Sequence, residues 1–328
     1  MNVIYLVKIL SSLLFIISFL YSMPVLYLLA FSLLSWSFTV YFYLSRAIIS
    51  DVIAANKWKA TFSNIQVIFN LAFVVGPILG GMVDDNGTLH AFIMMSILLL
   101  NIVAHNAITP SLESKKNRGG YKISEFIYPL KDLSLSIFLI GTIFVAISFM
   151  QLDLLLPITI QERIKVNDLN FLNFHVTPLL IYTLCLATNG LLTITFAKSF
   201  SRLSEKYTMK FAFVTSGLFY GVSMLIFAVA SRPSGFFLGI FILTIGELLV
   251  VSLHDTYVAT ISPEGMRSSY FSIASSRFAL SRVVAPQMIM IAASIGKTST
   301  FILIGIIAMC SSLIFSYLFS IPIKNKEW

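Results

Sequence analysis

Charged residues are scarce in this sequence. Asp, Glu, Lys and Arg together make up 11% of its 328 residues, whereas hydrophobic residues make up 58% and the mean hydropathy is +0.91. A water-soluble domain carries about 25% charged residues, because its surface must be solvated. The shortage therefore excludes an ordinary soluble fold and favours an integral membrane protein with several spans.

Cysteine is almost absent, and the patterns of catalytic and metal sites are missing. Cys185 and Cys310 both fall in apolar segments, so buried free thiols are expected in place of a disulfide framework. No nucleophile–base pair stands at usable spacing, and no Gly-rich loop could hold a phosphate. One adjacent His254–Asp255 pair is a weak metal signal by itself. We therefore expect neither an enzyme nor a bound cofactor or metal.

Long apolar runs are abundant. Runs of about 20 residues, the length that crosses a bilayer, occur ten times and predict an all-α membrane protein. The spans are expected at residues 3–22, 24–47, 60–83, 88–108, 133–158, 176–197, 211–230, 235–257, 269–294 and 299–321. Four spans form a predicted bundle over residues 1–108 and six form a second over 133–328. Residues 109–132, which are basic and contain Gly119-Gly120, read as a solvated cytoplasmic linker.

Basic residues outnumber acidic ones by 22 to 14, which gives a net charge of +8. If the amino terminus is cytoplasmic, fourteen basic residues lie in inner connectors and the tail. They are Lys57, Lys59, Lys115, Lys116, Arg118, Lys122, Lys131, Lys198, Arg202, Lys206, Lys210, Arg267, Lys324 and Lys326. Only Arg163, Lys165, Arg232 and Lys297 lie in outer connectors. This asymmetry predicts cytoplasmic amino and carboxyl termini, and it explains the charge without a nucleic-acid partner.

The sequence also contains an internal repeat. Adding 209 to the numbers of residues 62–77 aligns them with 271–286 at seven identities in sixteen positions: Phe62, Ser63, Phe69, Leu71, Val74, Val75 and Pro77. Two halves built on one plan are typical of membrane transporters. The matching span is third in the first half but fifth in the second. We therefore expect the chain to lack two spans of a twelve-span parent, or roughly 75–80 amino-terminal residues.

Several motifs occur in the order of a known family. Gly76-Pro77-Ile78-Leu79-Gly80-Gly81 resembles the Gly-Pro-x-x-Gly-Gly segment of the drug:proton antiporters within the major facilitator superfamily. Asp51, followed by Lys57 and Lys59, is similar to the family's signature at the inner end of helix four. Further resemblances are Gln151-Leu-Asp153 with Pro157, Gly246-Glu247, and Ser262-Pro-Glu-Gly-Met-Arg267 with Tyr270.

The resemblance implies two helical bundles that alternate access to a site at the middle of a bacterial cytoplasmic membrane. Gly76 and Pro77, together with Pro286 in the repeat, would form the bend that lets the bundles rock, while Gly80 and Gly81 allow close packing. It also implies that Asp51, Arg202 and Arg267 latch a cytoplasmic gate; the alternative is that they are solvated charges. The loop at residues 197–206 keeps Arg202 and Lys206 of a family motif but not its glycines or aspartate.

Ionisable residues inside apolar spans are costly and therefore indicate function. Glu247 lies about 16 Å from either end of its span at 1.5 Å per residue, where burial favours the protonated carboxyl group. Arg277 and Arg282, in the next span, are possible partners of Glu247. The group either exchanges protons or cationic substrate, or it is a static buried ion pair. Asp153 is a second candidate, with an interfacial carboxylate as its alternative.

An aromatic run at residues 36–43 is a further candidate. It could line a cavity for flat lipophilic cations, although lipid-facing packing is the other reading, since consecutive residues point all round a helix. The overall prediction is a proton-driven transporter of small lipophilic or cationic molecules, similar to multidrug efflux proteins. It would act as a monomer in the bilayer or need the missing helices. The alternatives are a peptide or sugar importer of the same fold and a non-transporting remnant or assembly partner.

Overall fold

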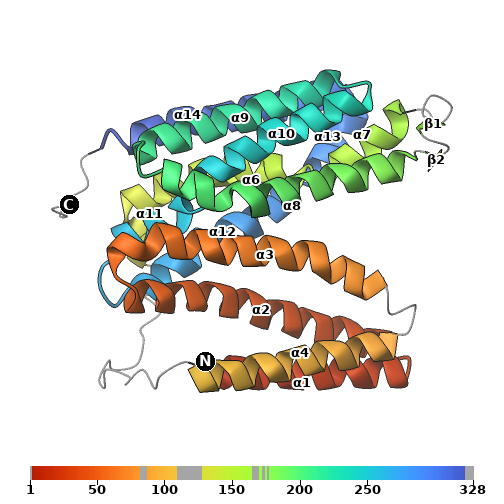
Figure 1. The fold of residues 1–328 in the computed structure, drawn as a ribbon, viewed down its shortest axis with the longest axis vertical. Coiled ribbons are helices and arrows are strands. Elements are labelled where there is room, and N and C mark those ends of the chain that lie inside the picture. Colours follow the sequence, from red (N-terminus) through yellow and green to blue (C-terminus); the bar gives the residue numbers. More distant parts are fainter. Residues whose placement is uncertain are drawn as a thin grey trace. The chain divides into compact units, whose positions relative to one another are not determined.

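The computed structural model describes residues 2–81, 87–108, 128–164, 170–171, 174–175 and 177–321 (Figure 1). Its α-helices, in chain order, are α1 (Asn2–Leu20), α2 (Pro24–Val52), α3 (Trp58–Gly81), α4 (Gly87–Ile108), α6 (Leu133–Met150), α7 (Leu155–Arg163), α8 (Pro178–Leu203), α9 (Met209–Val229), α10 (Pro233–Val250), α11 (Leu253–Ile261), α12 (Arg267–Val284), α13 (Gln287–Ile295) and α14 (Lys297–Leu318). Short 3-10 turns occupy Ala55–Lys57 and Tyr128–Lys131. Two short antiparallel strands, β1 (Asn170–Phe171) and β2 (Phe174–His175), lie between α7 and α8.

The predicted fold class is confirmed, because each of the ten predicted spans corresponds to a helix or a pair of helices. The pairs α6–α7, α10–α11 and α12–α13 each form one interrupted span. Within the described residues, seven spans are long and apolar enough to cross a membrane, and α1 and α4 add shorter apolar stretches at Ile4–Leu20 and Phe92–Val103. The β1–β2 pair was not predicted, since two-residue strands leave no periodic pattern.

Local sequence signals set several helix starts. Asp132 precedes α6, and its carboxylate accepts hydrogen bonds from the backbone N–H groups of Ser134 and Leu135 at 2.9 and 3.4 Å. Thr177 and Thr208 cap α8 and α9 in the same way. Such caps satisfy backbone donors that have no partner inside the helix.

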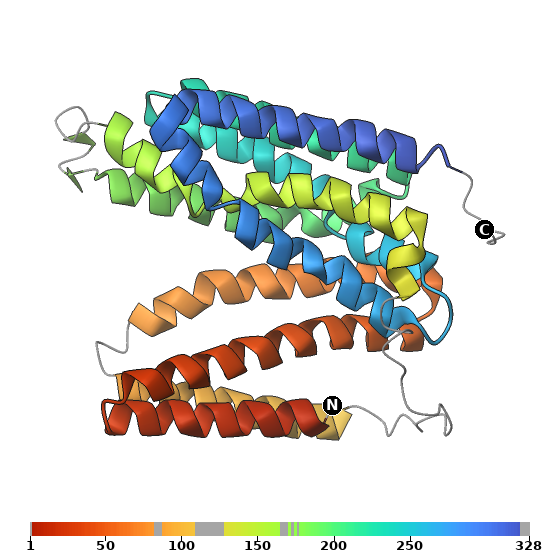
Figure 2. The ribbon, with the colours of Figure 1, turned by 180° about the vertical axis from the view of Figure 1, so that it is seen from behind.

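The chain forms two compact units. The first comprises Met1–Ile49 and Val75–Phe126, and the second comprises Ser50–Val74 and Ile127–Trp328. In the first unit α1 lies beside α4, and Ile16, Met95 and Leu98 form a small core between them (Figure 2). The predicted boundary at the linker stays a prediction, since most of residues 109–132 lie outside the described part of the chain.

Helix α9 is at the centre of the second unit. It packs along α14 on one side and α10 on the other, and α6 and α8 cover this group (Figures 1 and 2). The buried residues include Met224, Phe227, Phe236, Phe301 and Ile304. Outside the core, large apolar side chains such as Leu179, Val229 and Leu313 are at least 70% exposed, as expected of surfaces that face lipid.

Gln151 connects two of the interrupted spans. It follows α6, is fully buried, and donates from Nε2 to the carbonyl oxygens of Ile147 at 3.1 Å and Ala285 at 3.3 Å. Ala285 and Pro286 separate α12 from α13. A proline removes one helical hydrogen bond, so an amide side chain compensates for polar backbone where the helices break.

The connectors of the second unit gather at its two ends. At one end Ser201 in the last turn of α8 and Ser204 directly after α8 contact Lys59 at the start of α3, with donor–acceptor distances of 3.3 and 3.4 Å. At the other end the Arg163 guanidinium donates to the carbonyl oxygens of Phe227, Ala228 and Ala230 and to the Thr298 hydroxyl, all within 3.0 Å. The sequence predicts that the connectors in contact at the first end are cytoplasmic and that those in contact at the second end lie on the outer side.

Candidate functional site

The Glu247 carboxylate lies near the middle of the α10–α11 span and is held by a neighbouring helix. The Asn189 side-chain amide on α8 donates from Nδ2 to Glu247 Oε2 at 3.1 Å and to Thr244 Oγ1 at 3.0 Å. Thr244 stands three residues before Glu247 on α10, so both side chains face α8. The cluster therefore combines a carboxylate, a hydroxyl and an amide on two packed helices.

Arg277 of α12 contacts a different partner. Its Nη1 hydrogen-bonds Nδ1 of His254 on α11, and its guanidinium lies over the Phe278 ring at 4.6 Å. Arginine is always a donor, so His254 Nδ1 must accept and carries no proton in this arrangement. The His254 ring is packed between Phe138 and Phe213, with centroids 5.4 and 5.2 Å away.

The charges of Glu247 and Arg277 both act on one buried tyrosine. The Tyr220 side chain is 4% exposed and lies within electrostatic range of both charged groups. The carboxylate itself accepts its hydrogen bond from Asn189, while Arg282 is exposed near the end of α12. A direct pair between Glu247 and Arg277 or Arg282 stays a prediction.

Asp153 lies in the gap between α6 and α7. Its side chain is exposed and forms a hydrogen bond with the Tyr182 hydroxyl of α8. Pro157 follows four residues later and cannot donate a backbone hydrogen bond to the Asp153 carbonyl. The helix interruption therefore places the Asp153 carboxylate beside a break in the backbone hydrogen bonding of the span.

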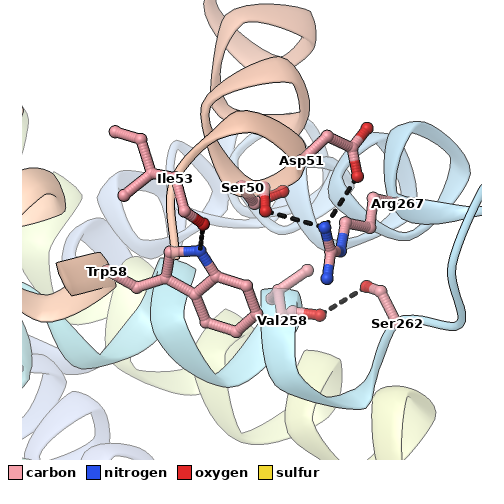
Figure 3. A network of polar contacts seen from close by, with 7 residues as sticks. All are labelled: Ser50, Asp51, Ile53, Trp58, Val258, Ser262 and Arg267. Carbon is pink, nitrogen blue, oxygen red and sulfur yellow. Dashed lines mark hydrogen bonds and ion pairs between the residues drawn. The ribbon is translucent and has the colours of Figure 1, made fainter. Parts of the chain in front are cut away.

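The predicted gate residues Asp51 and Arg267 form an ion pair (Figure 3). Arg267 Nη1 lies 2.8 Å from Asp51 Oδ1 and donates to the Ser50 carbonyl at 2.7 Å. The guanidinium also lies over the Trp58 ring at 5.2 Å, and Trp58 Nε1 donates to the Ile53 carbonyl at 3.0 Å. The side chain of Arg267 is 16% exposed and that of Asp51 is 52% exposed.

This ion pair, which we name the α2–α12 latch, joins the end of α2 to the start of α12. Beside it Phe62 and Phe271 are buried, with ring centroids 6.3 Å apart. Arg202, the third predicted gate residue, is exposed in the last turn of α8. The structure thus brings two of the three gate residues together.

The predicted bend residues Gly76, Pro77, Gly80 and Gly81 lie in α3, which continues through them. Their surroundings lie outside the described part of the chain. Pro286 is exposed at the interruption between α12 and α13. The part that these residues play in bending stays a prediction.

Sequence reasoning missed several partners. Asn189 and Tyr182 contact the candidate carboxylates from α8, and Trp58 lies against Arg267. An asparagine inside an apolar run is a recognisable signal, because an amide in hydrocarbon needs a partner. Lys8, buried in α1, was also missed, although a lysine in the first apolar run is just such a signal.

Comparison with known proteins agrees with the arrangement of helices. The family model of the Major Facilitator Superfamily matches residues 3–286. A Na(+), Li(+), K(+)/H(+) antiporter of Planococcus maritimus is 30% identical over 320 residues, which cover 92% of this chain and 76% of that protein. An uncharacterized MFS-type transporter of Bacillus subtilis (strain 168) is 22% identical over 232 residues, covering 69% of this chain and 54% of that one.

Solved structures show the same fold at low sequence identity. The fucose:proton symporter FucP of E. coli superposes with a TM-score of 0.73 at 13% identity, covering 96% of this chain and 82% of the symporter. The human organic anion transporter MFSD10 gives a TM-score of 0.69 at 16% identity, with 96% and 76% covered. At these identities the likeness concerns the fold and leaves the substrate open.

Proposed function

Because this chain belongs to the Major Facilitator Superfamily and is a transporter rather than an enzyme, we propose that it exchanges protons for monovalent metal cations. The observation that carries this proposal is the Glu247 carboxylate inside a membrane-spanning segment, where it accepts a hydrogen bond from the Asn189 amide that also donates to Thr244. A carboxyl group in that position is costly unless it has a function. The proton gradient is the driving force, and no cofactor is required.

The chemistry of the cluster suits such an exchange. A carboxylate can hold either a proton or a cation, and hard cations prefer oxygen ligands. The Asn189 amide now donates to Glu247, and a half-turn about its last side-chain bond would present Oδ1 instead. The cation would then meet oxygens from Glu247, Thr244 and Asn189. Binding of one ion excludes the other, which couples their movements.

The named function of the Planococcus relative supports this substrate class. That protein exchanges Na(+), Li(+) and K(+) for H(+), and the similarity extends over 92% of this chain. Asp153, which lies at a helix break with Tyr182, would provide a second carboxylate on the cation path. Arg277 would set the local potential around Tyr220.

The α2–α12 latch would close the cytoplasmic gate in one state of the cycle. Arg267 holds Asp51 and the Ser50 carbonyl at once, so a change of access requires both contacts to break. We place this end on the cytoplasmic side of a bacterial cytoplasmic membrane, because the connectors there carry most of the basic residues. Both chain termini would lie on that side, and the monomer would be the working unit.

Efflux of lipophilic organic cations is a second candidate function. The aromatic run on α2 supports it, since Trp36 and Phe38 are 55% and 49% exposed. Ring faces attract cations without the geometry that a metal ion demands. Both functions share the coupling carboxylate and differ in the cation that displaces the proton.

Everted membrane vesicles test the proposal. After acidification of the lumen, addition of Na+, K+ or Li+ should dissipate the pH gradient with the unaltered protein. Glu247→Gln should reduce this response at least tenfold at equal protein levels in the membrane. Glu205→Gln, a change to an exposed residue after α8, is the matched control and should stay within twofold.

The same assay separates the alternatives. A response to ethidium but not to alkali cations would favour organic-cation efflux. Responses only to peptides or sugars would favour an importer of this fold, and no response to any of them would favour a non-transporting remnant or partner. Undiminished cation response of Glu247→Gln would remove Glu247 from the mechanism.

A further inference from the structure

Lys8 is a buried charged residue in the first unit. It stands in α1 with 1% of its side chain exposed. Its Nζ atom lies 3.7 Å from the centroid of the Tyr41 ring and 4.4 Å from that of Phe38, both on α2. The Tyr5 ring of α1 is 5.8 Å away. Three rings from two helices therefore surround one ammonium group.

The environment of Lys8 is unusual for a lysine. Lysine side chains near a membrane normally extend to the interface or pair with a carboxylate. The ion pairs found among the described residues are Arg267–Asp51 and Lys297–Glu162. Within the same part of the chain, the Lys8 ammonium contacts aromatic rings. The charge is thus held by the faces of aromatic side chains.

The three rings form what we name the α1–α2 cage: Tyr5, Phe38 and Tyr41. The two tyrosines are tied to each other, with their hydroxyls 3.4 Å apart and their ring centroids 5.7 Å apart. Tyr5 is 4% exposed, whereas Phe38 is 49% exposed. The cage thus has a buried side at Tyr5 and an exposed side at Phe38.

Cages of this kind recognise ammonium ions. The face of an aromatic ring is electrostatically negative and attracts a cation within about 6 Å, most strongly where water is excluded. All three rings lie within that distance of Nζ. Organic ammonium ions are bound in this way because they are only weakly hydrated compared with small metal ions.

We propose that the α1–α2 cage is a binding site for small alkylammonium ions, and that the Lys8 side chain is its built-in occupant. An external alkylammonium ion enters when Lys8 withdraws, so the two compete for the same rings. The aromatic run at residues 36–43, for which organic-cation binding and lipid-facing packing were the two readings, thus holds a cation of the chain itself.

The site is distinct from the cation site proposed at Glu247. The cage lies in the first unit and recognises its ligand through rings, whereas Glu247 lies in the second unit among oxygen and amide groups. Its test measures binding rather than transport, so either proposal can fail while the other stands.

Removal of the occupant gives the first test. Lys8→Ala deletes three methylene groups and the ammonium, which together correspond to an n-propylammonium ion. The purified full chain in detergent should then bind n-propylammonium and show a saturable rise in its unfolding temperature. The unaltered protein and Lys8→Met, whose side chain fills the same space without charge, should show at most a third of that rise.

Two controls identify the rings as the binding element. The neutral 1-propanol should not stabilise Lys8→Ala, since the cage selects a cation rather than an apolar chain. The double variant Lys8→Ala with Tyr41→Leu keeps apolar bulk but loses the nearest ring, and it should lose the response to n-propylammonium. Equal stabilisation by 1-propanol, or an undiminished response of the double variant, would overturn the proposal.

A second measurement uses the unaltered protein and does not depend on the folding of a variant. Brief acetylation with acetic anhydride, read by mass spectrometry, should modify the buried Lys8 slowly and the exposed Lys57 quickly. Tetramethylammonium should compete for the rings, displace Lys8 and raise its acetylation at least twofold, with Lys57 unchanged. No increase at Lys8, or the same increase with neutral tert-butanol, would contradict competition for the cage.

Discussion

At the scale of single residues, the molecule keeps few charges in its apolar spans and holds them by different means. Glu247 accepts a hydrogen bond from the Asn189 amide of the neighbouring helix α8, Arg277 contacts a histidine, and Lys8 lies against the faces of aromatic rings. Each arrangement avoids leaving a charge without a partner in a region of low dielectric constant. In the Asp51–Arg267 ion pair the Asp51 side chain is half exposed, so this pair belongs to a more polar region.

Double-mutant analysis of the α2–α12 latch gives a prediction at this scale. Asp51→Ala and Arg267→Ala, alone and together, should show a favourable coupling of about 1 kcal/mol in the free energy of unfolding, because Asp51 is too exposed for a larger one. Arg267→Ala alone should cost about 1–3 kcal/mol, since the contacts of Arg267 with the Ser50 carbonyl and the Trp58 ring are lost as well. Thermal or denaturant unfolding in detergent measures these values.

Arg202→Ala is the matched control for the latch. Arg202 is an exposed basic residue on the same end of the unit, so its replacement should change the free energy of unfolding by less than about 0.5 kcal/mol. Coupling indistinguishable from zero between Asp51 and Arg267 would mean that the ion pair has no energetic part in closing this end.

The charged residues were predictable from sequence, and their partners largely were not. A glutamate in the middle of an apolar run is conspicuous because so few charges occur there. Its partner Asn189 lies 58 residues away in the sequence, and no local pattern predicts that the two side chains meet. The resemblance between motifs assigned Asp51 and Arg267 to one gate, but it did not predict their direct ion pair.

At the scale of helices, the second unit contains three interrupted spans. The breaks before Pro157 and at Pro286 have a local cause, since proline cannot continue the hydrogen-bond ladder. The break at Val251–Ser252 between α10 and α11 contains no proline or glycine. Hydropathy alone predicted one continuous span in each case, because it depends on how apolar the side chains are and not on whether each backbone hydrogen bond of the helix is formed.

Close packing of α9 on α14 gives a prediction for these elements. A Cβ atom at Gly221 would lie 2.9 Å from the Gly305 carbonyl oxygen and would also strike the Met309 side chain. Gly221→Ala should therefore force the two helices apart and cost about 1–3 kcal/mol of stability. Unfolding in detergent measures the loss.

Gly235→Ala is the comparison for that substitution. Gly235 lies at the start of α10, and its added Cβ would lie 3.1 Å from the Ala230 side chain. Alanine is the better helix former by about 1 kcal/mol. The two effects should nearly cancel. If Gly221→Ala proved as harmless as Gly235→Ala, the α9–α14 contact would be looser than the structure places it.

At the scale of the whole molecule, the internal repeat reappears as contacts between equivalent residues. Phe62 and Phe271, which are 209 apart, lie against each other, and Trp58 lies against Arg267 at the same offset. The division into bundles and the two missing spans stay predictions.

Proton release on cation binding tests the central claim most directly. Adding Na+ or K+ to the purified protein in weakly buffered detergent should displace the proton from Glu247, and a pH indicator should detect up to about one proton per chain. Glu247→Gln should release none, whereas Glu205→Gln should match the unaltered protein. Equal release from Glu247→Gln and the unaltered protein would contradict the account, because the exchanged proton would then reside elsewhere.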